Sequence, residues 1–141
     1  MQNVNMTKVA IAGALGTLAM TIVMLVGPMM GMPKMDMGVM LGTMNPMMEL
    51  PYFVGWMMHF VIGIMLTFIY AAFLIDKLPS EGWMKGAIYS IIPFLVMQMM
   101  LGPMMGMPFF SGGEMMAIMG SLLGHLAYGS VMGYVYNRAD H

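Results

Sequence analysis

Long runs of apolar residues alternate along the chain with short segments rich in polar residues, glycine and proline. Four of these runs are long enough to cross about 30 Å of hydrocarbon, which takes roughly 20 helical residues. They are Val9 to Gly27, Pro51 to Ile75, Gly86 to Met104 and Met116 to Tyr136. Because a helix pairs its own backbone groups inside a membrane, the pattern predicts an all-α membrane protein, a four-transmembrane-helix bundle forming one domain over residues 1–141.

Composition supports a bilayer as the solvent. The chain is 60% hydrophobic and 8% charged, against roughly 45–50% and about 25% in soluble domains. In water such a chain would expose large apolar patches, which monomeric soluble proteins rarely do. A net charge of −1 gives no bulk attraction to nucleic acid. The lack of cysteine excludes disulfides and thiolate chemistry, and the sequence has no recognisable hydrolase, phosphate-loop or zinc-protease motif, so we do not expect an enzyme.

Basic residues predict the orientation in the membrane. Lys8, Lys77, Lys85 and Arg138 fall at the N-terminus, in the middle loop and at the C-terminus, whereas the other two loops hold only Lys34. By the positive-inside rule, we expect cytoplasmic termini and outward-facing loops at residues 28–50 and 105–115.

An internal repeat divides the chain into two units, of about residues 8–75 and 85–138. The heptapeptide Gly-Pro-Met-Met-Gly-Met-Pro at residues 27–33 recurs unchanged at residues 102–108. Downstream, both copies continue with the spacing His-x3-Gly-x6-Tyr, which begins at His59 and at His125. Each unit holds two crossings, so we expect two tandem helical hairpins, parallel and related by a pseudo-two-fold axis along the membrane normal.

The repeat places His59 and His125 at equivalent depths within membrane spans, where an ionisable residue suggests a function by default. Small residues lie one turn before and after each of them: Gly55 and Gly63, and Ser121 and Gly129. Such faces allow close helix packing or leave room for a flat cofactor. The alternative is a purely structural role, in which each histidine bonds to one of the few polar groups of the neighbouring helices: Thr17, Thr21, Ser90 and Gln98.

The chain contains 27 methionines, and fifteen of them lie between residues 28 and 50 or between 104 and 119, at the side predicted to face outward. A thioether is a soft, neutral ligand that prefers Cu(I). The repeated heptapeptide contributes Met29, Met30, Met32, Met104, Met105 and Met107, which we expect to form a metal-binding mouth above the two histidines. Methionine also fills irregular apolar space, as leucine does, so enrichment alone is weaker evidence than location.

The first outward loop contains a predicted short helix that begins after Asp36, a good N-cap residue. Methionines at spacings of three and four form a stripe on it with Leu41, namely Met37, Met40, Met44 and Met48. The stripe either captures copper or is the apolar side of an interfacial helix that lies on the bilayer. In the first span, Met20-x3-Met24 resembles the pore motif of the eukaryotic copper transporter family.

Three segments carry a wider resemblance: Gly13 to Thr21, Met30 to Asp36 and Gly55 to Phe60. With the overall arrangement, they resemble an uncharacterised family of small bacterial Met-rich four-helix membrane proteins, whose function is unassigned. The resemblance implies a bacterial inner membrane and nothing about activity. With the orientation predicted from the basic residues, the methionine-rich loops would then face the periplasm.

Three functions follow as hypotheses. The first is a copper-handling protein, in which outer methionines collect Cu(I) above a two-histidine site; we expect binding rather than transport. The second is a b-type cytochrome, with His59 and His125 as axial ligands of one haem b. The third is an accessory subunit of a larger respiratory or copper-enzyme membrane complex; a homo-oligomer is also compatible with the sequence.

Overall fold

The computed structural model describes residues 3–44 and 47–138, and this part of the chain contains helices and no strand. Its four membrane-spanning segments are Met6–Met30, Tyr52–Leu74, Gly82–Met104 and Met115–Arg138. The predicted all-α fold with four transmembrane helices is therefore confirmed. In order, the elements are α1 (Met6–Val26), η1 (Gly27–Met30), α2 (Met37–Gly42), α3 (Tyr52–Ile69), η2 (Tyr70–Leu74), α4 (Gly82–Val96), η3 (Met97–Leu101), α5 (Gly102–Met104), η4 (Phe109–Gly113) and α6 (Met115–Arg138).

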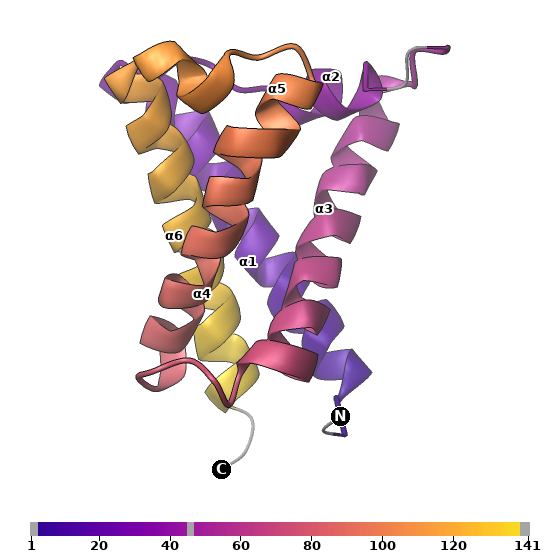
Figure 1. The fold of residues 1–141 in the computed structure, drawn as a ribbon. Helices are drawn as coiled ribbons and strands as arrows, with labels where there is room; N and C mark the ends of the chain where they lie inside the picture. The colour runs from indigo at the N-terminus through magenta and orange to yellow at the C-terminus, as the bar shows by residue number, and fades with distance from the viewer. Residues whose placement is uncertain (1–2, 45–46, 139–141) are drawn as a thin grey trace.

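Both described ends of the chain lie at one end of the bundle, which we call the terminal end, together with the connection between η2 and α4 (Figure 1). The opposite end, the loop end, holds α2, α5 and the loops that flank them (Figure 1). The two groups of segments that the sequence assigns to opposite sides of a membrane are thus separated by the length of the helices.

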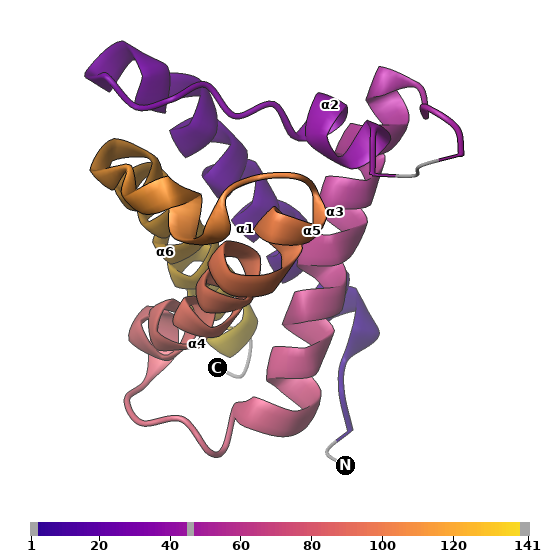
Figure 2. The same cartoon turned by 45° about the horizontal axis from the view of Figure 1, so that its top comes forward.

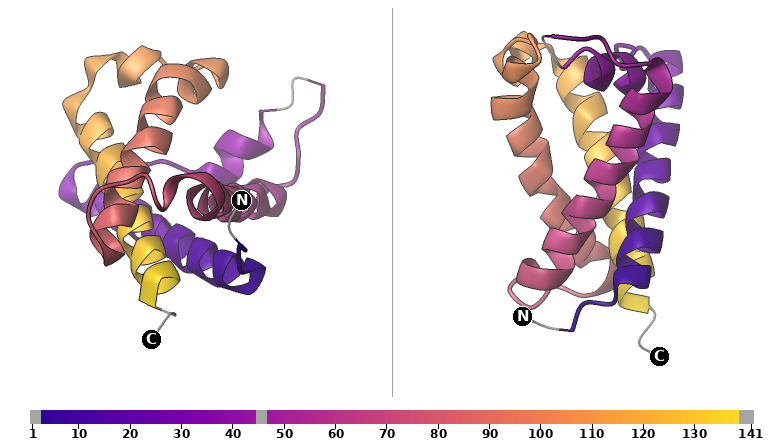
Figure 3. Two further views of the ribbon diagram at one scale, coloured as in Figure 1. Left: turned by 60° about the horizontal axis from the view of Figure 1, so that its bottom comes forward. Right: turned by 90° about the vertical axis from the view of Figure 1, so that its right-hand side faces the viewer.

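The spanning helices pack in the order α3, α1, α6, α4. Helix α1 lies along α6, α3 packs against α1, and α4 packs against α6. Although α3 and α4 follow each other in the chain, extended contact between them is lacking in the described residues, and mainly η2 reaches α4. The divergence of α3 and α4 is visible in Figure 2 and from the terminal end in Figure 3. A two-fold axis would make the α3–α4 contact resemble the α1–α6 contact, so the predicted pseudo-symmetric arrangement is not confirmed.

Glycines bring the packed helices into backbone contact. A Cβ added at Gly86 of α4 would lie 2.0 Å from the carbonyl oxygen of Gly129 in α6. A Cβ added at Gly13 of α1 would lie 2.7 Å from Cα of Ile64 in α3, and one added at Gly63 of α3 would lie 1.8 Å from Oγ1 of Thr17 in α1. A side chain at Gly86 or Gly13 would meet backbone of the neighbouring helix, so these contacts fix the spacing of α4 from α6 and of α3 from α1.

Helix α2 crosses the loop end and is attached to α3. Its N-cap is Asp36, as predicted: the carboxylate accepts hydrogen bonds from the amides of Gly38 at 3.0 Å and Val39 at 3.3 Å. The hydroxyl of Tyr52 donates to the same carboxylate at 3.2 Å. Gly38 lies so close to Gly55 that a Cβ added at Gly55 would be 2.1 Å from the Gly38 carbonyl oxygen. The beginning of α3 therefore determines where α2 lies.

Candidate functional site

A cavity of about 380 Å³ lies between α1, α3, α4 and α6, is open to the side where α3 and α4 diverge, and is covered at the loop end by Met35 and α2. His59 of α3 and His125 of α6 both line it and are only 7% and 8% exposed. The sequence therefore identified two histidines that the fold brings to one chamber.

The hydrogen bond of His125 determines which ring nitrogen is free to act as a ligand. Its Nδ1 lies 2.7 Å from the carbonyl oxygen of Ser121, one turn earlier in α6. A carbonyl oxygen only accepts hydrogen bonds, so Nδ1 carries the proton and a neutral ring has its lone pair on Nε2. Metal-binding histidines are commonly oriented in this way, by donating their second ring nitrogen to a backbone carbonyl.

His59 has the opposite character, because its Nε2 is buried and lacks a hydrogen-bond partner among the described residues. The ring is held by apolar contacts, edge-on to Trp56 with centroids 5.8 Å apart and to Phe60 with centroids 6.1 Å apart. Leaving a buried polar atom unpaired costs about 1–3 kcal/mol. Native structures rarely contain such an atom without a reason, and a missing ligand is one.

The polar groups expected to satisfy a structural histidine have other partners. Thr17 donates to the carbonyl of Gly13 at 2.8 Å, and Thr21 donates to that of Thr17 at the same distance. Ser90 donates to the carbonyl of Ala87 at 2.7 Å. The amide oxygen of Gln98 accepts a hydrogen bond of 2.9 Å from Ser111. These bonds weaken the structural interpretation of the two histidines.

The small residues around the histidines serve helix packing rather than cofactor space. Gly55 is against α2 and Gly63 against α1, as described above. At Gly129, an added Cβ would be 2.2 Å from the carbonyl oxygen of Gly86. Three of the four flanking positions are thus occupied by neighbouring backbone or side chains, which removes the space that the sequence offered to a porphyrin there.

Methionine side chains supply much of the chemistry of the cavity wall. Five of them both line the cavity and pack together around its loop end, and we call these the thioether cluster: Met20, Met24, Met35, Met37 and Met105. Met44 and Met97 also line the cavity. Two imidazoles and several thioethers therefore converge on one apolar space.

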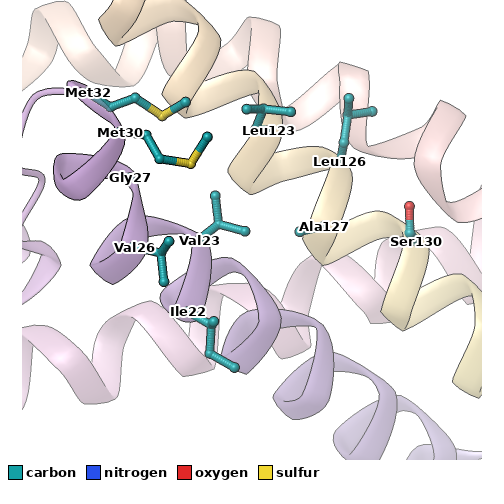
Figure 4. A pocket seen from close by; sticks show the side chains of 10 residues that line it. All are labelled: Ile22, Val23, Val26, Gly27, Met30, Met32, Leu123, Leu126, Ala127 and Ser130. Atoms are coloured by element: carbon teal, nitrogen blue, oxygen red, sulfur yellow. The ribbon is translucent and has the colours of Figure 1, made fainter.

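Of the six methionines predicted from the repeated heptapeptide, the structure brings only Met105 to this cavity. Met29, Met30 and Met104 are 86%, 66% and 68% exposed. Met107 is half-buried near Gly102. Met32 is buried against Gly27 and Gly120 and, with Met30, lines a separate groove between α1 and α6 (Figure 4).

The cavity methionines outside the heptapeptide had partial signals in the sequence. Met20 and Met24 are the pair with the x3 spacing in the first span, and Met37 and Met44 belong to the stripe of the short helix. That stripe faces the cavity at Met37, Leu41 and Met44, so these residues cover protein space instead of the bilayer surface. Met35 and Met97 belong to no spacing pattern that distinguished them.

Toward the terminal end of the cavity, tyrosine hydroxyls bridge the helices, and beyond them the lining continues on the α3 side to Ile69 and Leu74. Tyr128 of α6 donates to the carbonyl of Gly63 at 2.7 Å, and its oxygen lies 2.9 Å from Oγ1 of Thr67. Tyr89 of α4 donates to the carbonyl of Leu66 at 2.8 Å. Both tyrosines line the cavity, and we call this group the tyrosine floor.

Within residues 3–44 and 47–138, no group of three or more His, Cys, Asp or Glu side chains is placed to hold a metal ion. The atoms of this cavity that could bind a metal ion are instead neutral: an Nε2 lone pair on His125, an unpaired Nε2 on His59 and thioether sulfurs. Such a set suits a soft monovalent cation better than a divalent ion, because it brings no negative charge into the apolar interior.

Comparison with known proteins gives one match. Residues 3–141 match a family described as "Family of unknown function (DUF6789)". Neither the curated proteins nor the solved structures contain a significant match.

Proposed function

The chain belongs to that family of unknown function, and we propose that it is a membrane protein that binds Cu(I) at a site formed by His59, His125 and the thioether cluster. The observation that carries the proposal is the unpaired Nε2 of His59, buried in the same cavity as the oriented ring of His125. A bound ion would accept the lone pairs of both rings and so remove the unpaired buried nitrogen.

The oxidation state follows from the donor set. Imidazole and thioether are both neutral, and thioether favours Cu(I) among the copper ions. The charging cost of an ion in a low-dielectric interior rises with the square of its charge, so a divalent ion without an anionic ligand is strongly disfavoured there. Cu(I) with neutral ligands leaves a single positive charge, and it needs no deprotonated ligand to bind.

A haem b between the same histidines has weaker support. The glycines that were expected to make room for a porphyrin contact neighbouring helices. Lys34, the basic residue of the outward loops, is exposed and does not line the cavity, where it would have paired with a propionate. An absorbance spectrum distinguishes the two cofactors directly, because haem gives intense visible bands and Cu(I) gives none.

We also propose that the loop end faces the periplasm of a bacterial inner membrane and that the termini are cytoplasmic. The charge asymmetry supports this orientation. Lys8 is in the first turn of α1, Lys77 and Lys85 are in or next to the connection from η2 to α4, and Arg138 ends α6, whereas Lys34 lies in the loop before α2. Copper would then meet the protein in an oxidising compartment, where thiols form disulfides and no longer bind metal. Thioethers form no disulfides and keep their affinity for Cu(I) there.

The test is elemental analysis and an absorbance scan of protein purified from copper-supplemented, haem-replete cells. We expect stoichiometric copper in the wild type and its loss in His59→Ala and His125→Ala. Met24→Leu and Met37→Leu remove buried cluster sulfurs and should weaken binding, whereas Met29→Leu and Met104→Leu remove exposed sulfurs and serve as matched controls. Substoichiometric copper that is unchanged in both histidine variants would refute the proposal. Migration as part of a larger assembly in mild detergent would instead favour an accessory subunit.

A further inference from the structure

The two ends of the cavity differ in construction, and this difference bears on how the proposed site is reached. On the basis of the proposed function, we infer that Cu(I) enters and leaves only from the loop end, past a movable roof formed by residues 35–44. Toward the terminal end, the tyrosine floor packs with Met132, Leu74 and Leu78 in one apolar cluster, so we expect the site to hold copper without passing it across the membrane.

The floor is tied across three helices by hydrogen bonds. Tyr128 joins α6 to the backbone of α3 at Gly63, and Tyr89 joins α4 to the backbone of α3 at Leu66. The ring of Tyr70 packs against that of Tyr89 with centroids 5.2 Å apart. These three tyrosines are at most 2% exposed and pack with Met132 and Ala12 in one buried cluster. Opening a path here requires breaking buried hydrogen bonds and separating helices.

The roof lacks such ties to the opposite wall. Among the spanning helices, α2 makes extended contact with α3 alone. The hydrogen bonds that hold residues 35–44 stay within the segment or run to its near neighbours Leu50 and Tyr52. Its contact with α1 and with Met105 consists of apolar packing around Met37 and Leu41. Such packing is re-formed at low cost by flexible methionine side chains.

The third possible route, sideways between α3 and α4, is unsuitable for an ion. Isoleucines that line the cavity on this side, Ile62 and Ile92, are partly exposed toward the surroundings of the helices. Those surroundings are hydrocarbon, in which an unliganded charge is expensive. The roof is different because Met35, Met37 and Met44 bring sulfur to the cavity there. An ion entering past them exchanges one soft ligand for another until it reaches the two imidazoles.

The experiment measures sidedness in proteoliposomes that contain the full chain loaded with Cu(I), sorted by orientation. A membrane-impermeant, anionic Cu(I) chelator is added outside, and the copper it removes is followed by absorbance. We expect removal when the loop end faces the chelator and retention when the terminal end faces it. Removal at similar rates from both ends, or arrival of copper at a chelator enclosed on the terminal side, overturns the inference.

A roof variant makes the test specific to residues 35–44. A Cβ added at Gly38 would lie 2.6 Å from the rings of Trp56 and Tyr52, so Gly38→Ala pushes α2 away from α3. We expect loop-end removal to accelerate on the order of tenfold, equivalent to about 1.4 kcal/mol of barrier. Val39→Ala, at an exposed position on the same helix, is the control. An unchanged rate in Gly38→Ala contradicts a route through the roof.

A second pair of variants does not depend on displacing a helix. Met44→Leu removes a sulfur that lines the cavity, whereas Met40→Leu removes one that packs nearby without lining it. Met44→Leu should slow loading from the loop end several-fold, and Met40→Leu should not. Total copper, measured before the chelator is added, distinguishes failure of the proposed function from failure of the proposed route. Equal copper in the wild type and in His59→Ala refutes both the copper site and the entry route. Copper that depends on the histidines but leaves from the terminal end refutes the entry route alone.

Discussion

Replacing His59 by phenylalanine should stabilise the metal-free protein and abolish the copper binding proposed above. Phenylalanine keeps an aromatic ring for the edge contacts with Trp56 and Phe60, and the adjoining cavity accommodates its larger ring. The variant removes Nε2, which is buried without a partner. Because an unsatisfied buried polar atom costs about 1–3 kcal/mol, we expect the free energy of unfolding to rise by a value in that range.

His125→Phe provides the matched comparison, because the two histidines differ in their hydrogen bonding. It keeps the edge contact with Phe94, whose ring centroid lies 5.8 Å from that of His125. It loses the hydrogen bond from Nδ1 to the carbonyl of Ser121. A typical net contribution of such a bond is about 0.5–1.5 kcal/mol, so this variant should be less stable than the wild type by that amount.

The assay is reversible unfolding in mixed micelles, first with a Cu(I) chelator present and then with Cu(I) in excess. At a free Cu(I) concentration of about 100 times Kd, binding should stabilise the wild type by about 2.7 kcal/mol and neither variant at all. A metal-free His59→Phe protein that is less stable than the wild type would show that Nε2 has a partner. The central argument for a ligand in this cavity would then fail.

Three further predictions concern the scaffold. Gly86→Ala should separate α4 from α6 and greatly lower the free energy of unfolding, because the new Cβ would be 2.0 Å from a backbone oxygen. Gly124→Ala is the control in the same unfolding assay, since its Cβ would meet only the flexible Met20 side chain at 3.4 Å. Tyr128→Phe should lower stability by about 1 kcal/mol through loss of its hydrogen bonds, and an unchanged midpoint would contradict that role. Asp36→Ala should destabilise α2 by about 1 kcal/mol, seen as faster hydrogen exchange of the Gly38 and Val39 amides that it caps.

The sequence predicted the spans and the cap well because both depend on local chemistry. A run of apolar residues as long as Tyr52–Leu74 has to cross the bilayer as a helix, whatever its neighbours are. Asp36 caps α2 because its carboxylate reaches amides two and three residues later. The shared chamber of His59 and His125 was also foreseeable, since polar side chains in a span face the bundle interior.

The positions of the methionines were harder to predict because they depend on which helices pack together. The heptapeptide repeat is identical in both copies, but Met30 is exposed and its counterpart Met105 lines the cavity. The difference arises because the α1–α6 contact has no equivalent between α3 and α4. Residue spacing along one helix cannot reveal that inequality. The stripe on α2 likewise faces the protein because Gly38 meets Gly55, a contact between segments distant in sequence.

The two repeats pack unequally, and the two histidines of the proposed site therefore have different roles. His125 is oriented by its own helix before any ion arrives, so its Nε2 is ready to bind. Among the described residues, Nε2 of His59 has no hydrogen bond that orients it, and His59 lies on α3, the helix that also carries the roof. Tyr128 ties α3 to α6 on the terminal side of the histidines, so the roof would move while the two spanning helices stay together. Ordered binding would follow, with the already oriented His125 first and His59 last.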